Sequence, residues 1–182
     1  NKNSELRAFP DKFYGPVFEV LLFGAEKITG PASGRELYNL RHGISFLHYW
    51  ASLVCFWIIV SYIFKDAFYG MLGMIFLMLT PRLFAESFYN TKDLPLLSGY
   101  IFSFAAFIWT AKKTTALRVA VFALISAYTS AIRPFGLFFP ALFIGLTSIQ
   151  IIQQSKKIPK IPRMNAIYLF TYCLLLSIFW PA

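Results

Sequence analysis

The sequence has 182 residues, of which 58% are hydrophobic, 19% are aromatic and only 14% are charged. Because soluble domains carry about 25% charged residues, this composition argues against a soluble protein and indicates a chain that folds in lipid. The formal net charge of +9 would suit a nucleic-acid-binding protein, but the basic residues lie at the edges of apolar runs, which is typical of membrane proteins and argues against nucleic acid as a partner.

We expect an all-α fold in two parts, of which the first is an extracytoplasmic loop over residues 1–43. Charges of both signs are mixed along this region. Its apolar stretch, residues 17–23, is shorter than the roughly 20 residues that cross a bilayer, so it predicts an amphipathic helix lying in the membrane interface. Residues 30–34, GPASG, predict a turn after this helix.

Residues 44–182 predict a bundle of about six transmembrane helices. Ile44–Phe64 carries no formal charge and predicts the clearest span, and Lys65 with Asp66 predicts a tight turn after it. The other spans are expected at residues 67–80 and beyond Pro81, 94–111, 117–132, 135–152 and 164–180. No signal pattern precedes the first apolar segment, and the chain ends abruptly after the last one, so we expect a fragment that lacks at least one earlier span.

The basic residues of the spanning region predict its orientation. If the spans alternate, one side receives the connections Lys65–Asp66, Lys112–Arg118 and Lys156–Arg163, and the other receives only Arg82, Lys92 and Arg133 as basic residues. The excess of positive charge marks the first side as cytoplasmic. All acidic residues occur by Asp93, and all except Asp66 fall in segments assigned to the outside. Any chemistry that needs a carboxylate is therefore expected on the extracytoplasmic side.

The polar segment between the second and third expected spans is the most informative part of the sequence. Arg82, Glu86, Asn90 and Asp93 are spaced by four, four and three residues, which would place them on one stripe of a helix. Lys92 lies beside this stripe. Two interpretations stay open: a binding or catalytic site, and an ordinary polar loop in which Arg82 pairs with Glu86 at the membrane surface.

A sequence resemblance favours the first interpretation. Residues 81–96, PRLFAESFYNTKDLPL, closely resemble the second extracytoplasmic loop of family 39-type glycosyltransferases, which have the GT-C fold and include dolichyl-phosphate-mannose protein mannosyltransferases and the lipid A aminoarabinose transferase. The core of that pattern is Pro-Arg, an aromatic-rich stretch and Asn-x-Lys-Asp-x-Pro. Residues 12–19 look like the end of the family's first loop, and residues 41–42 and 132–137 also have counterparts.

The resemblance implies a membrane enzyme that moves a sugar from a polyprenyl-phosphate donor to a protein, glycan or lipid acceptor. We expect a multi-pass protein of the bacterial inner membrane or the endoplasmic reticulum membrane, with its active face extracytoplasmic. Positive charge or a divalent metal would stabilise the leaving phosphate, and a carboxylate would take the proton of the acceptor hydroxyl. Lys92, Arg82 and Arg133 are the candidates for the positive charge.

Two residues are the catalytic candidates. Asp93 is similar to the acidic residue of the second loop that helps organise the family's active site; placed before Leu94 and Pro95, it also suits a helix N-cap. The family's catalytic acid lies in the first loop, soon after a span that we expect to precede Asn1. Asp11 is the Asp that remains in this loop and is the second candidate.

The candidate substrate-binding residues come from several segments. They are Lys92, Asn90, Arg82, Glu86, Arg133, Tyr14 and His42. Tyr14 is part of Tyr-Gly-Pro where several relatives have Lys-Pro-Pro, so the phosphate-contacting lysine of those relatives is either lost here or replaced by Lys12. Arg133 is equally suited to anchor the chain at the membrane surface by snorkelling. Glu19 is either a metal ligand or an interfacial acid paired with Lys12 or Lys27.

A transporter or flippase for lipid-linked sugars is the alternative function. Transporters place ionisable residues near the bilayer midplane, where His48 is the one candidate in the clear spans, and this favours the enzyme. We expect His48 to be a hydrogen-bonded packing residue. Cys55 and Cys173 lie inside apolar runs and are expected to be small buried hydrophobic residues.

Overall fold

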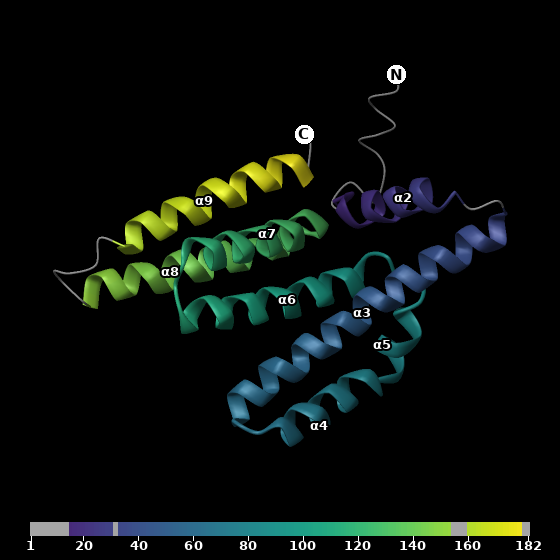
Figure 1. Ribbon diagram of the computed structural model, residues 1–182, viewed down its shortest axis with the longest axis horizontal. Coiled ribbons are helices and arrows are strands. Elements are labelled where there is room, and N and C mark those ends of the chain that lie inside the picture. Colours follow the sequence, from purple (N-terminus) through teal and green to yellow (C-terminus); the bar gives the residue numbers. More distant parts are fainter. Residues whose placement is uncertain (1–14, 31–32, 154–159, 180–182) are drawn as a thin grey trace.

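The computed structural model describes residues 15–30, 33–153 and 160–179, and this part of the chain consists of helices joined by short turns, with no strand. The expected all-α fold is therefore confirmed (Figure 1). The elements in chain order are α2 (Val17–Thr29), α3 (Gly34–Phe64), α4 (Ala67–Met78), α5 (Pro81–Glu86), α6 (Asp93–Lys112), α7 (Ala116–Ile132), the 3₁₀ helix η1 (Pro134–Leu137), α8 (Phe138–Gln153) and α9 (Lys160–Phe179).

Three helices of the described chain are long and apolar enough to cross a membrane: α3, α6 and Ile161–Phe179 of α9. They correspond to the first, third and sixth expected spans. The second, fourth and fifth correspond to shorter apolar helices, Ala67–Met78, Ala116–Ile132 and Pro134–Ile149. Since a perpendicular crossing takes about 20 helical residues, these shorter helices do not by themselves meet the length of a span.

The expected helix through Pro81 is not present. α4 ends at Met78, and α5 begins at Pro81 after the extended residue Thr80, whose side chain bonds to the carbonyl of Phe76. Proline has no backbone N–H to donate and disfavours a helical conformation in the residue before it, so the helix stops there and a new one begins with Pro81 in its first turn. The break turns residues 81–86 away from the line of α4 (Figure 1).

The N-terminal part differs from expectation in length. α2 extends from the predicted apolar stretch to Thr29, and α3 starts ten residues before the expected span, at Gly34. Ser33 explains this early start, because its side chain accepts a hydrogen bond from the backbone of Glu36 (3.3 Å) and so caps the helix. α3 thus runs without interruption across the expected boundary between residues 43 and 44.

The turn expected at Lys65 and Asp66 is confirmed. Lys65 has a positive φ of 57°, and Asp66 caps α4 by accepting from the backbone of Phe68 (2.8 Å). The hairpin then packs tightly, because a Cβ added to Gly70 would lie 1.9 Å from the hydroxyl of Ser61. Glycine at this position lets α4 approach α3 closely, as small residues do in membrane helices.

The interior joins α6, α7, α8 and α9, with α3 packed against α6. Its buried apolar residues include Val119, Phe122, Phe139, Phe143 and Tyr168. Hydroxyl groups connect the helices here: Ser98 donates to Ser52 (3.2 Å), Ser103 bonds to Thr129 (3.0 Å) and Tyr172 donates to Ser130 (2.9 Å). Such short polar side chains hold helices together in lipid, where apolar surface alone gives little preference for protein over solvent.

The helices alternate in direction, so their connections gather at two ends (Figure 1). The α3–α4 and α6–α7 connections lie at one end together with the end of α8 and the start of α9, and this is the end predicted to be cytoplasmic. The other end brings together α2, the start of α3, α5, the start of α6 and the end of α7. At this end the backbone N–H of Gly15 donates to the carbonyl of Ile132 (3.0 Å) and ties the N-terminal segment to α7.

Candidate functional site

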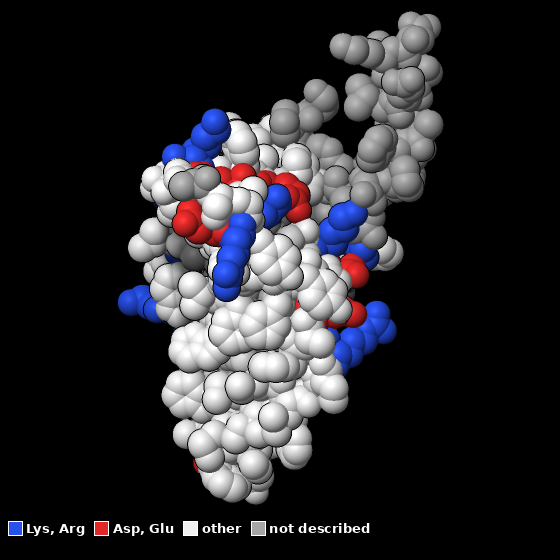
Figure 2. Space-filling model, turned by 90° about the vertical axis from the view of Figure 1, so that its right-hand side faces the viewer, with Lys and Arg blue, Asp and Glu red and all other residues white. Residues whose placement is uncertain are grey.

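Charged side chains gather at the end of the molecule where α5 meets α6. Figure 2 looks at this end and shows acidic and basic side chains beside one another, while the lower part of the same face carries none over a broad area. α4 itself exposes large apolar side chains, among them Phe68, Tyr69 and Phe76. The separation suits a protein whose charged end lies in water and whose sides lie in lipid.

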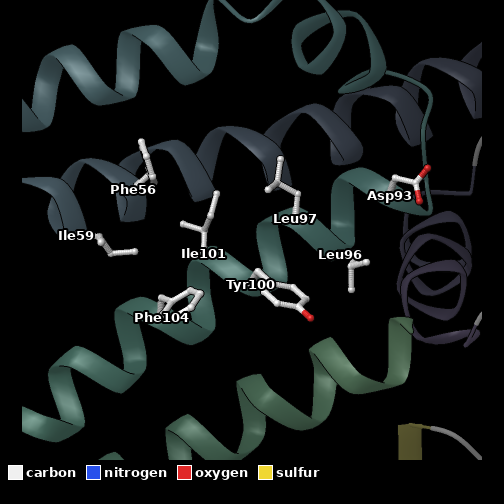
Figure 3. Close-up of a pocket in the computed structure, with 8 residues that line it drawn as sticks. All are labelled: Phe56, Ile59, Asp93, Leu96, Leu97, Tyr100, Ile101 and Phe104. Atoms are coloured by element: carbon white, nitrogen blue, oxygen red, sulfur yellow. The ribbon is translucent and has the colours of Figure 1, made fainter. Parts of the chain in front are cut away.

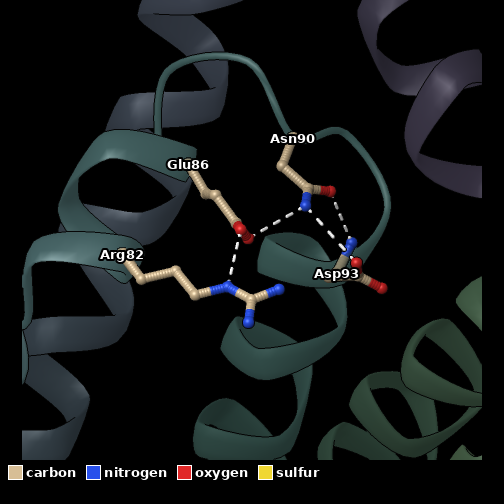
Figure 4. A network of polar contacts seen from close by, with 4 residues as sticks. All are labelled: Arg82, Glu86, Asn90 and Asp93. Carbon is tan, nitrogen blue, oxygen red and sulfur yellow. Dashed lines mark hydrogen bonds and ion pairs between the residues drawn. The ribbon is translucent and has the colours of Figure 1, made fainter.

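Four polar residues of the segment after α4 form one network (Figure 4). Arg82 donates through Nε to Oε1 of Glu86 (2.9 Å), and Asn90 donates through Nδ2 to Oε2 of Glu86 (3.1 Å). The same Asn90 nitrogen lies 3.4 Å from Oδ2 of Asp93. The hydrogen bond and the charge of Glu86 raise the pKa of Arg82, which therefore stays cationic.

These residues meet by a different route from the one expected. They do not share a helical stripe, because α5 ends at Glu86 and a turn follows. Asn90 organises this turn: its Oδ1 accepts from the backbone N–H groups of Lys92 (3.0 Å) and Asp93 (2.8 Å). The capping role expected for Asp93 is thus carried out by Asn90, while Lys92 is the N-cap residue and Asp93 the first residue of α6. A carboxylate there also interacts favourably with the helix dipole.

Arg133 joins this network from the other side of α6. Its Nη2 lies 2.6 Å from Oδ1 of Asp93, a distance typical of a strong charge-assisted hydrogen bond. The two side chains are 24% and 50% exposed, so the pair stays in contact with solvent. Arg133 follows the last residue of α7 and precedes Pro134, which starts η1. Two residues 40 positions apart in sequence, Asp93 and Arg133, are therefore brought into direct contact.

An apolar groove of about 520 Å³ runs between α3 and α6 and ends at Asp93 (Figure 3). Its other lining residues are Phe56, Ile59, Leu96, Leu97, Tyr100, Ile101 and Phe104. Leu96, Tyr100 and Phe104 repeat every four residues along α6, a spacing that sequence reasoning could have used to extend the site from Asp93 but did not. Tyr100 donates to the carbonyl of Phe135 (2.7 Å) and so links the groove wall to η1.

The remaining candidates lie apart from this network. Glu19 pairs with Arg41, not with Lys27, and Arg41 also contacts Glu26 (3.5 Å), which ties α2 to α3. His42 stacks on Tyr38, with ring centroids 3.8 Å apart. No cluster of three His, Cys, Asp or Glu side chains that could hold a metal ion occurs in the described chain.

The other expectations concern one histidine and two cysteines within the helices, and three residues near the N-terminus. His48 contacts Tyr128 through Nε2 (3.3 Å) and lies among the rings of Phe18 and Phe102, which agrees with the expected packing role. Cys55 is partly buried, whereas Cys173 is exposed, contrary to expectation, because it faces outward from α9. Asp11, Lys12 and Tyr14 lie outside the described residues.

Known protein families, curated proteins and solved structures compared with this chain gave no match. The interpretation of the site therefore depends on its geometry and on the sequence pattern of residues 81–96.

Proposed function

We propose that this protein is a membrane glycosyltransferase that moves a sugar from a polyprenyl-phosphate donor to an acceptor hydroxyl on the extracytoplasmic side. The single observation that carries the proposal is the apolar groove between α3 and α6 whose lining includes Asp93, the carboxylate that pairs with Arg133. A lipid-linked sugar phosphate has the same order of parts: a long apolar chain, an anionic phosphate and a sugar. The resemblance of residues 81–96 to family 39-type glycosyltransferases supports the same conclusion.

In this proposal the groove between α3 and α6 takes the polyprenyl chain. Its lining consists of aliphatic and aromatic side chains apart from Asp93 and the hydroxyl of Tyr100. Burial of each methylene group contributes about 0.8 kcal/mol in transfer from water, although a donor that comes from lipid gains less. The groove therefore serves mainly to place the phosphate at the charged end.

The phosphate and the sugar then lie beside Arg133, Lys92 and Asp93. The acceptor oxygen attacks the anomeric carbon and forms a new C–O bond, while the bond from that carbon to the phosphate oxygen breaks and its electron pair leaves with the phosphate. Asp93 takes the proton of the acceptor hydroxyl. Arg133, with Lys92 next to Asp93, stabilises the negative charge that develops on the phosphate.

A divalent metal does not fit the acidic residues described at this end. Glu19 and Glu26 both lie against the guanidinium of Arg41, whose positive charge opposes a cation at the same carboxylates. Asp93 is engaged with Arg133 in the same way. The proposed reaction therefore uses arginine and lysine to stabilise the phosphate, and no step passes through a metal ion.

We extend the proposal to a bundle of about six spans of the GT-C type, in the bacterial inner membrane or the endoplasmic reticulum membrane. The shorter apolar helices α4, α7 and η1–α8 would complete the six, since the direction of the chain alternates through them (Figure 1). A transporter is the less supported function, because the network joins α5 to the first residue of α6 and so lies at a helix end and not at the middle of a span.

A larger side chain in the groove tests the proposed function, because it should weaken the binding of the donor's polyprenyl chain. The Ile59→Trp variant is expected to raise the donor KM about tenfold, or about 1.4 kcal/mol, with little change in kcat, because the larger ring occupies space for the chain and leaves the reacting groups in place. Initial rates of conversion of a labelled polyprenyl-phosphate sugar by protein in liposomes measure both constants.

The matched control is Ile63→Trp, one turn further along α3, where the side chain is 62% exposed and lies outside the groove lining. This variant should keep the KM of the native protein. An equal rise in both variants, or no donor conversion by the native protein with any acceptor class, would count against the proposed function.

A further inference from the structure

Asp93 and Arg133 form an ion pair, although the proposed function gives them separate roles. Asp93 takes a proton from the acceptor, and Arg133 stabilises the phosphate. Arg133 comes from the end of α7 and Asp93 from the start of α6, and Asp93 is also one of the residues that line the apolar groove. Both remain partly open to solvent, with 24% and 50% of their side-chain surfaces exposed. A soluble or membrane-borne anion can therefore approach the guanidinium beside the carboxylate.

Both oxygens of Asp93 are held in this arrangement. Oδ1 accepts from Arg133 (2.6 Å), and Oδ2 lies 3.4 Å from Nδ2 of Asn90. Asn90 is itself fixed, because Oδ1 accepts from the backbone of Lys92 and Asp93, and Nδ2 also donates to Glu86. A general base needs an oxygen directed at the hydroxyl that it deprotonates. Release of Arg133 would therefore leave Oδ1 of Asp93 without its donor and available to an acceptor hydroxyl.

A phosphate group is the natural replacement for this carboxylate. Carboxylate and phosphate oxygens both match the planar fork of N–H donors in a guanidinium, so the two groups are alternative partners for the same arginine. Asp93 belongs to the groove lining and pairs with Arg133, so a lipid in the groove would place its head group near this arginine. The two anions would repel each other if both stayed on one side of Arg133.

We propose that the site is regulated by anion exchange on Arg133, in which the phosphate of an isoprenoid lipid displaces the carboxylate of Asp93. The inference rests on the proposed function and adds its control step: the base is held by Arg133 while the groove is empty and is released when the donor is in place. Asp93 therefore competes with the substrate for Arg133 as well as serving the reaction.

Competition between Asp93 and a lipid phosphate for Arg133 predicts that loss of the Asp93 charge tightens the binding of that lipid. This affinity can be measured without sugar transfer. The probe is farnesyl phosphate, an isoprenoid monophosphate, titrated against the purified protein in detergent at fixed ionic strength. Asp93→Asn is expected to bind the probe about tenfold more tightly than the native protein, because the competitor has lost its charge. Arg133→Gln is expected to bind it about tenfold more weakly, and Asp93→Asn/Arg133→Gln should show no gain over Arg133→Gln alone.

Two controls separate exchange on Arg133 from a general effect of charge. Glu26→Gln removes one negative charge at the same end from a residue that pairs with Arg41, and should leave the affinity within about twofold. Farnesol has the same chain with a neutral head, and its affinity should be the same in the native protein and in Asp93→Asn. Asp93→Ser, which also lacks the charge, provides the same comparison if Asp93→Asn does not purify as a monodisperse protein.

Several results would overturn the exchange. These are an unchanged or weaker affinity in the Asp93 variants, an equal gain in Glu26→Gln, a gain that persists without Arg133, and no binding of farnesyl phosphate to the native protein. The outcome is distinguishable from a failure of the proposed function. If Asp93→Asn binds the probe more tightly but the native protein transfers no sugar, the proposed transferase function is wrong and the anion exchange is supported. If the native protein transfers sugar but Asp93→Asn does not bind more tightly, the transferase function is supported and the anion exchange is wrong.

Discussion

Asp93→Asn is expected to lower the rate of sugar transfer by about 10² to 10⁴-fold while the protein still folds and inserts. The amide keeps the shape of the side chain and its place at the start of α6, but it cannot accept a proton from the acceptor hydroxyl. The loss should appear in kcat, with donor binding no weaker than in the native protein. The measurement is the initial rate of product formation from a labelled polyprenyl-phosphate sugar by the purified protein in liposomes.

Asp66→Asn is the matched control for this variant. Asp66 caps α4 at the opposite end of the molecule, where its Oδ1 accepts from the backbone of Phe68 (2.8 Å). Asparagine is also a good N-cap residue, so Asp66→Asn should keep both stability and transfer. A rate of transfer in Asp93→Asn equal to that of the native protein would show that Asp93 is not the base of the reaction.

Arg133→Gln is expected to lower the rate of transfer by about 10² to 10³-fold, the range found when one group that stabilises a developing negative charge is removed. The substitution takes the positive charge from the leaving phosphate and leaves Asp93 without its partner from the end of α7. Arg133→Lys restores the charge but not the fork of donors, so it should recover only part of the rate. The rate assay is the one used for Asp93.

Arg118→Gln controls for the loss of an arginine in general. Arg118 lies in the first turn of α7, at the other end of the bundle, where it donates to the carbonyl of Trp109 (2.8 Å) and stacks on its ring. Its removal should leave transfer unchanged. Equal rates in Arg133→Gln and the native protein would show that the ion pair with Asp93 is a structural anchor and nothing more.

The local features of this fold were predictable because short stretches of sequence determine them. The apolar run after Ile44 gives a helix, and Lys65 with Asp66 gives a turn. The spacing of Arg82, Glu86 and Asn90 correctly indicated that these polar side chains lie together. Each of these depends on neighbours within about four residues, where helix and turn geometry leave few alternatives.

The wrong predictions concern helix boundaries, where the effect of a helix-breaking or capping residue was not included, and contacts between residues far apart in the sequence. Pro81 ended a helix that was expected to continue, and Ser33 started α3 earlier than its apolar run suggested, although Ser-x-x-Glu is a known capping pattern. The contacts of Asp93 with Arg133 and of Glu19 with Arg41 join different helices. Helical periodicity carries no information about which helices pack together, so neither pair could be found from spacing alone.

The groove was also beyond sequence reasoning. Phe56 and Ile59 on α3 line the groove together with Leu97 and Ile101 on α6, where the two helices pack and Ser98 donates to Ser52 (3.2 Å). An apolar side chain that lines a groove and one that faces lipid have the same pattern in the sequence. The packing of the helices distinguishes them.

The central claim is that the segment between Pro81 and Pro95 faces the extracytoplasmic water, where a lipid-borne sugar phosphate reaches Asp93. The most direct test is labelling of Thr91→Cys by a membrane-impermeant maleimide, in protein whose Cys55 and Cys173 are replaced by alanine. Thr114→Cys, at the α6–α7 connection, is the reciprocal control. In intact cells or sealed microsomes of known orientation, Thr91→Cys should react from the extracytoplasmic side and Thr114→Cys from the cytosol. Labelling of Thr91→Cys only from the cytosol would contradict the proposed transferase.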